Sequence, residues 1–139
     1  MTPITTTKIA LDTNILIYNH FLTDHEKRTI AHKLLACNPV VSTQVVSEYL
    51  NVMKRLLVVP KVEILDLCSQ WMNECSIHSV ERSTVSIAKR LVQHYDFQIF
   101  DAIIVASALE ANCQILYSED MHHNMKINGQ LTIINPFVE

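Results

Sequence analysis

Short apolar runs alternate with longer stretches of helical periodicity, and this alternation limits the possible folds more than any other feature of the chain. Each run is short enough to be a buried strand and is bounded by polar or turn residues. Strands that are separated by helices are typical of a parallel sheet packed between helices. We therefore predict an α/β fold with a central, mainly parallel sheet of roughly five strands, at 8–11, 40–41, 75–80, 114–117 and 131–134.

The helical stretches between these runs begin at residues that commonly cap helices. Capping side chains accept hydrogen bonds from the free backbone N–H groups of the first turn. The stretch DAIIVASALEA at 101–111 is almost uniformly apolar and small, so we expect this helix to be buried on most sides. The expected caps or first residues of the other helices are Asp12 or Thr13, Asp24, Ser42 or Thr43, Pro60, and Ser83.

Length and composition fit a single folded domain over residues 1–139. The chain is 49% hydrophobic and 18% charged, which suits a protein that buries its own core and is unlike a disordered segment. No apolar run approaches the ~20 residues that cross a bilayer, and the N-terminus lacks the pattern of a signal peptide. We therefore expect a cytoplasmic protein that does not use a membrane.

The cysteines lie far apart with no CxxC pair, so we expect all of them to be small buried side chains, namely Cys37, Cys68, Cys75 and Cys113.

Two further features exclude classes of function. Gly129 is the only glycine, so the sequence contains neither a phosphate-binding P-loop nor a dinucleotide-binding fingerprint. The formal net charge of −3 argues against nucleic-acid binding through bulk positive charge. A nuclease with this charge needs local basic residues, or bound cations, where it meets phosphate.

Four acidic residues fall where a parallel α/β sheet gathers functional side chains. Asp12 ends the first predicted strand, and Asp120 lies just past the fourth. Asp101 opens the apolar helix, and Glu48 lies about one turn inside the helix that follows the second strand. Because these places converge on one edge of such a sheet, we expect the four carboxylates to lie close together. They cannot all stay ionised without compensation, which Mg²⁺ or Mn²⁺ with oxygen ligands provides, and such ions support chemistry on phosphates.

Each acid also has a purely structural interpretation. Asp12 and Asp101 could be helix caps, and either one alone is better explained that way. Asp120 could be a turn residue. Glu48 could be an exposed helix acid, although its apolar neighbours indicate a partly buried face, where an unpaired carboxylate is costly. The four positions together are more informative than any one of them.

Four segments carry a resemblance that spans nearly the whole chain. They are LDTNILIY at 11–18, STQVVSEYLNV at 42–52, IFDAIIVASALEANCQILYSEDM at 99–121, and INPF at 134–137. In this order they resemble the PIN-domain family, specifically the toxins of VapBC-type toxin–antitoxin pairs. The resemblance implies a Rossmann-like α/β/α sandwich and a metal-dependent endoribonuclease whose partners are an RNA substrate and a cognate antitoxin protein.

The resemblance also implies roles for individual residues. It assigns catalysis and metal binding to Asp12, Glu48, Asp101 and Asp120. Ser118 is the polar residue expected to assist the last acid, and Thr13 and Asn14 are candidates for supporting the site. One departure follows Asp120, where His122-His123-Asn124 replaces the more usual glycine-containing turn.

Rival functions stay open at this point. A non-catalytic binding module with the same fold would be expected to lose its acids, and the acid set is intact. A phosphatase or a DNA-directed nuclease would use a similar set. We also expect a homodimer, because the small chain has more apolar helix surface than one sheet covers, at Leu56, Leu57, Val58, Val59 and Ile64. Surface-loop roles are expected for the adjacent histidines, and packing roles for Trp71, Tyr18 and Tyr49.

Overall fold

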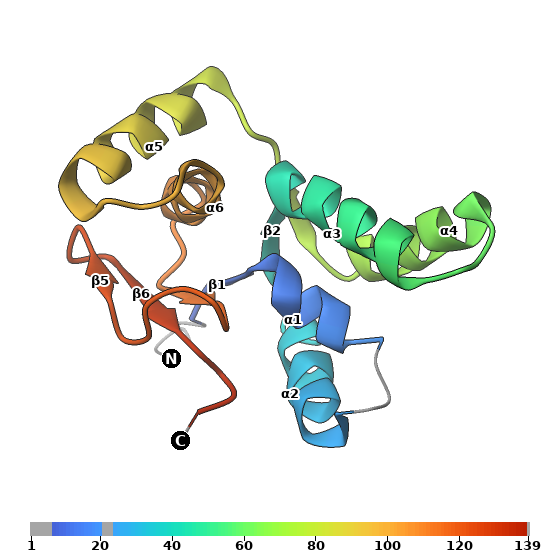
Figure 1. Ribbon diagram of the computed structural model, residues 1–139. Helices are drawn as coiled ribbons and strands as arrows, with labels where there is room; N and C mark the ends of the chain where they lie inside the picture. Colours follow the sequence, from blue (N-terminus) through green and yellow to red (C-terminus); the bar gives the residue numbers. More distant parts are fainter. Residues whose placement is uncertain (1–6, 21–23, 139) are drawn as a thin grey trace, which may run out of the picture.

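The computed structural model describes residues 7–20 and 24–138. Its centre is a six-stranded sheet in the order β3-β2-β1-β4-β6-β5 (Figure 1). Neighbouring strands pair in parallel, except for the antiparallel pair of β5 with β6. The predicted α/β class with a mainly parallel sheet is therefore confirmed. The strands are β1 (Ile9–Leu11), β2 (Val40–Ser42), β3 (Ser76–His78), β4 (Ile115–Tyr117), β5 (Lys126–Ile127) and β6 (Leu131–Ile134).

The short edge strand β5 is the one that the apolar pattern did not predict. It forms a hairpin with β6 through a turn in which the N–H of Gln130 donates to the carbonyl oxygen of Ile127 at 3.0 Å. The two central residues, Asn128 and Gly129, have φ values of +52° and +67°. Asn-Gly suits such a turn because both residues tolerate positive φ at little cost. This dipeptide was the sequence signal that could have revealed the hairpin.

The helices form two groups, one on each side of the strands (Figure 1). The chain steps from β1 to β2 to β3 in one direction and then returns to β4 beside β1. Since parallel crossovers are right-handed, this reversal places α1 to α4 on one face and α5 and α6 on the other. The helices are α1 (Thr13–Tyr18), α2 (His25–Leu35), α3 (Thr43–Leu56), α4 (Lys61–Met72), α5 (Arg82–Tyr95) and α6 (Ile99–Glu110).

Most helix starts follow the prediction, but two differ. Asp24 and Ser42 cap α2 and α3 through hydrogen bonds from the backbone to their side chains. The helix α5 is capped by Glu81 rather than Ser83, because Glu81 and Thr84 exchange side-chain and backbone hydrogen bonds in a capping box. Asp101 does not open α6: the helix starts earlier, at Ile99, so Asp101 lies within its first turn.

The core surrounds the central strands and the apolar helix α6. The side chains of α6 are buried from Ile104 through Leu109, as expected for a helix covered on most sides. On the other face, the rings of Tyr49 and Trp71 pack edge to face with centroids 5.2 Å apart. Both rings are buried, which confirms their predicted packing role. No helix in the described ranges is long and apolar enough to span a membrane.

The expectation of four buried cysteines is wrong for two of them. Cys68 and Cys113 are buried in the core, but Cys75 is half-buried and Cys37 is exposed. Cys37 follows the end of α2, and the next residue, Asn38, takes a left-handed backbone with φ of +51°. This turn directs the chain back toward β2 and leaves the thiol on the surface.

Candidate active site

Asp12 and Ser118 form the buried centre of the candidate site. They directly follow β1 and β4, two adjacent parallel strands in which Leu11 pairs with Tyr117. Residues that leave neighbouring parallel strands emerge side by side, and the Ser118 hydroxyl accordingly donates to Asp12 Oδ2 at 2.7 Å. Asp12 also caps α1, since its Oδ1 accepts from the N–H of Thr13 at 2.7 Å. The predicted cap and the predicted site position are therefore one residue, which is only 5% exposed.

The other three acids approach this centre from separate elements. Glu48 comes from α3, Asp101 from the first turn of α6, and Asp120 from the segment after β4. All four line one pocket of about 420 Å³. Thr13 and Asn14 line the same pocket, so the structure brings together the acids and both supporting candidates.

Three of the pocket's acids, Asp12, Glu48 and Asp101, resist ionisation. Burial, with smaller contributions from the nearby carboxylates of Asp101 and Asp120, raises the pKa of Asp12 from 3.8 to about 6. The hydrogen bonds from Ser118 and Thr13 act in the opposite direction but do not cancel the effect of burial. Burial also raises the pKa of Glu48 and of Asp101, and neighbouring acids add to both shifts. A cation in the pocket would relieve this cost.

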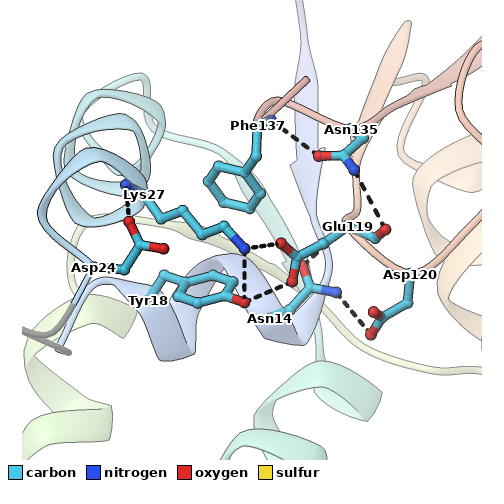
Figure 2. Close-up of polar contacts among 8 residues, drawn as sticks. All are labelled: Asn14, Tyr18, Asp24, Lys27, Glu119, Asp120, Asn135 and Phe137. Carbon is cyan, nitrogen blue, oxygen red and sulfur yellow. Dashed lines mark hydrogen bonds and ion pairs between the residues drawn. The ribbon is translucent and has the colours of Figure 1, made fainter. Parts of the chain in front are cut away.

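Polar side chains orient two of the acids. The Asn14 amide donates to Asp120 Oδ2 at 3.1 Å (Figure 2), and the Gln44 amide donates to Glu48 Oε2 at 3.4 Å. The hydroxyl of Thr13 is buried and has no hydrogen-bond partner within the described part of the chain. A buried hydroxyl normally has a partner, so this oxygen is available to a ligand of the pocket.

The pocket offers oxygen atoms that could bind a hard divalent cation. This donor set consists of carboxylates and one free hydroxyl, which is the oxygen chemistry that Mg²⁺ and Mn²⁺ prefer. Across 7–20 and 24–138, no three acidic, histidine or cysteine side chains converge tightly enough to coordinate one ion. The donor chemistry therefore fits such a cation, while the four acids share a pocket rather than a single coordination point.

Three residues at this edge were not predicted to belong to the site, namely Glu119, Tyr18 and Lys27. Glu119 is a fifth acid lining the pocket, and its carboxylate pairs with Lys27 of α2. Tyr18, predicted only to pack, also lines the pocket and donates to Glu119 Oε1 at 2.6 Å (Figure 2). The position of Glu119 between Ser118 and Asp120 was a usable signal. Lys27 carried no such signal.

The adjacent histidines face different surroundings. His122 is exposed. His123 is half-buried, and its Nδ1 accepts from the backbone N–H of Asn135 at 2.9 Å. His123 therefore supports the loop after β4 and does not line the acidic pocket.

Residues 9–126, most of the chain, match the sequence profile described as the PIN domain. The chain belongs to the PIN-domain family. No curated protein sequence matches this PIN domain. Three solved structures resemble it over most of their length.

The first is a toxin–antitoxin complex from Klebsiella pneumoniae, with a TM-score of 0.69 and 19% identity over 94% of this chain and 98% of that one. The second is FitAcB from Neisseria gonorrhoeae, with a TM-score of 0.71 and 17% identity over 93% and 98%. The third is VapC20 from Mycobacterium tuberculosis, a toxin that cleaves the sarcin–ricin loop, with a TM-score of 0.65 and 19% identity over 81% and 90%. At such low identity, these likenesses show a shared fold.

Proposed function

We propose that this PIN-domain protein is a metal-dependent endoribonuclease that hydrolyses RNA phosphodiester bonds with Mg²⁺ or Mn²⁺. The observation that carries the proposal is the pocket lined by Asp12, Glu48, Asp101 and Asp120; together with Glu119, these acids make up the charged lining of the pocket among the residues that the structure describes. An all-acid pocket repels phosphate unless cations compensate it. A bound divalent cation would supply positive charge to the phosphate and lower the pKa of an attacking water.

Each side chain of the pocket has a proposed task. Asp12, Glu48 and Asp101 would hold the cation, and Asp120 would complete the site. Ser118 holds Asp12 in place through its hydroxyl, because one buried hydrogen bond limits rotation of the carboxylate. Asn14 does the same for Asp120, and the free Thr13 hydroxyl would contact the ligand of the pocket.

We further propose that the protein is the toxin of a type II toxin–antitoxin pair. Support comes from the structures that share its fold, which include a toxin–antitoxin complex and a toxin that cleaves the sarcin–ricin loop. The cognate antitoxin would insert a basic side chain, most simply arginine, into the acidic pocket and pair with the carboxylates in place of the cation. Expression of this chain alone should slow cell growth, and normal growth with abundant soluble protein would contradict this assignment.

A homodimer is part of the same proposal. Leu56, Val58 and Val59, where α3 ends and the chain leads to α4, have exposed side chains, and Val58 is fully exposed. Such adjacent apolar side chains are typical of an interaction surface. This exposed apolar surface is smaller than expected from the sequence, because Ile64 is buried in the core and Leu57 is half-buried.

The test is a cleavage assay with three substrates under two conditions. Pure protein is incubated with RNA, single-stranded DNA and a phosphomonoester, each in Mn²⁺ and in EDTA. We expect internal cleavage of RNA alone, only with Mn²⁺. Cleavage of DNA or the phosphomonoester would favour the rival enzyme classes, and no cleavage would favour a binding module.

A matched pair of variants guards against a contaminating nuclease. Asp101→Asn should abolish cleavage, whereas Asp66→Asn should not. Asp66 is an exposed acid of α4 outside the pocket, so both variants make the same chemical change. Equal activity of the two variants would contradict the proposed site.

A further inference from the structure

Lys27 and Glu119 form an ion pair at the rim of the acidic pocket (Figure 2). Lys27 lies in the first turn of α2, and Glu119 follows Ser118 in the segment after β4, 92 residues away in sequence. Their side chains are 29% and 23% exposed, so the pair is partly shielded from water. The electrostatic attraction within a partly shielded ion pair is stronger than that within a fully exposed pair.

Two aromatic side chains, Tyr18 and Phe137, contact the pair. The Tyr18 hydroxyl donates to Glu119 Oε1 at 2.6 Å and accepts from Lys27 Nζ at 3.2 Å. The ammonium group also lies 4.7 Å from the ring centre of Tyr18 and 5.2 Å from that of Phe137. These contacts fix the direction of both side chains, and they turn the Glu119 carboxylate toward α2 and away from Asp120 (Figure 2).

Hydrogen bonds through Asn14 connect the backbone of Glu119 to Asp120 in the pocket. The N–H of Glu119 donates to Asn14 Oδ1 at 3.2 Å, and the amide of Asn14 in turn donates to Asp120 Oδ2 at 3.1 Å. Movement of Glu119 would therefore disturb both Asn14 and Asp120. Nothing in the proposed chemistry uses the Glu119 carboxylate, although it lines the pocket.

We propose that Lys27 is a positioning residue, which keeps the fifth carboxylate, that of Glu119, directed away from the four pocket acids and thereby holds Asp120 in place. This inference rests on the proposed nuclease function. Without Lys27, Glu119 is an unpaired carboxylate beside an acidic pocket and is free to turn into it. The pocket then attracts cations more strongly, but Asp120 loses the arrangement that Asn14 and Glu119 maintain.

The test compares Lys27→Met with the double variant Lys27→Met/Glu119→Gln. Methionine keeps an apolar stem against the rings of Tyr18 and Phe137 but removes the charge. For Lys27→Met we expect Mn²⁺ to bind about fivefold more tightly by calorimetry, because a positive charge is lost and a carboxylate is freed. We expect kcat for RNA cleavage to fall about tenfold with little change in KM.

The double variant carries no unpaired charge, so both the Mn²⁺ affinity and kcat should return to within about threefold of wild type. Lys27→Arg, which keeps the ion pair, should behave like wild type in both measurements. Lys33→Met is the matched control: Lys33 is an exposed lysine of the same helix whose side chain has no ion pair or hydrogen bond among the described residues. If Lys27→Met does not fold, Lys27→Gln, which also removes the charge, takes its place with the same expected changes in Mn²⁺ affinity and kcat.

Other outcomes would overturn the inference in distinguishable ways. A raised KM that the double variant does not correct would mean that Lys27 contacts RNA directly. A lower melting temperature with unchanged Mn²⁺ affinity and kcat would mean that Lys27 only stabilises α2. If wild type itself neither binds Mn²⁺ nor cleaves RNA, the proposed function fails and the inference fails with it.

Discussion

Replacing Asp12 with asparagine should make the metal-free protein more stable at neutral pH, although this residue is the centre of the proposed site. The change removes the charge of a carboxyl group that is only 5% exposed. Asparagine keeps an oxygen that can accept from the N–H of Thr13, and it caps a helix about as well as aspartate. The variant therefore separates the cost of the buried charge from the structural role of the residue.

The size of the effect follows from the pKa of Asp12. Burial raises this pKa from 3.8 to about 6, and one pKa unit corresponds to about 1.36 kcal/mol. The ionised carboxylate thus lowers the free energy of unfolding by about 3 kcal/mol at neutral pH. Asparagine avoids this cost but weakens the hydrogen bond from Ser118, which is worth roughly 1 kcal/mol. We expect a net gain of about 2 kcal/mol for Asp12→Asn.

The sign of the pH dependence provides the sharper test. A folded carboxyl group with a raised pKa is penalised only where it ionises, so its penalty is absent below pH 3.8 and grows as pH rises to about 6. Above that pH the penalty is complete. The advantage of Asp12→Asn should therefore be full at pH 7.5 and nearly gone at pH 4.

The assay is urea unfolding of both proteins in EDTA at pH 7.5 and pH 4. Comparing the variant with wild type at each pH cancels the contributions of other titrating groups that the two proteins share. A variant less stable than wild type at pH 7.5, or an equal difference at both pH values, would refute the reasoning. Either result would mean that Asp12 is stabilised as a carboxylate by the fold.

Three further predictions address the site and the assembly. Saturating Mn²⁺ should raise the melting temperature of wild type, because a ligand at a hundredfold excess over its Kd stabilises the folded state by roughly 2.7 kcal/mol. Asp101→Asn should lose most of this rise, while its stability in EDTA stays equal to that of wild type or is slightly higher. An equal rise in both proteins would remove Asp101 from the site. Ser118→Ala should lower the free energy of unfolding by about 1–3 kcal/mol, because its buried hydroxyl donates to Asp12 and accepts from the N–H of Met121 at 3.2 Å, and an unchanged urea midpoint would count against this. Light scattering at micromolar concentration should give about twice the 15.9 kDa chain mass, and Val58→Asp should reduce it to the monomer; a wild-type mass near 15.9 kDa would contradict the dimer.

The sequence determined the features that depend on a few neighbouring residues. Apolar periodicity located β1, β2, β4 and β6 to within about a residue, because burial acts on each strand through its own side chains. The caps at Asp24 and Ser42 were likewise predictable, since a cap bonds to backbone groups within one turn. The placement of Asp12 directly after an apolar strand was enough to predict its position at the sheet edge.

Where local alternatives were close in energy, the sequence did not decide. Ser83 and Glu81 are both able to cap α5, and the capping box with Thr84 selects Glu81. Ser83 instead donates to Glu110 of α6, a partner that lies 27 residues away. Likewise, α6 begins before Asp101 because Ile99 and Phe100 can form a helical turn even though both are exposed.

Only the tertiary structure decided which distant residues meet. The strand order places β1 beside β4, and this adjacency brings Asp12 to Ser118 and Asn14 to Asp120, each pair 106 residues apart. The same packing buries Asp12 and raises its pKa, an effect that depends on the groups around it and not on its neighbours in sequence. No sequence pattern distinguishes Lys27 from the other lysines of the chain. It reaches Glu119 only because the fold packs α2 against the segment that follows β4.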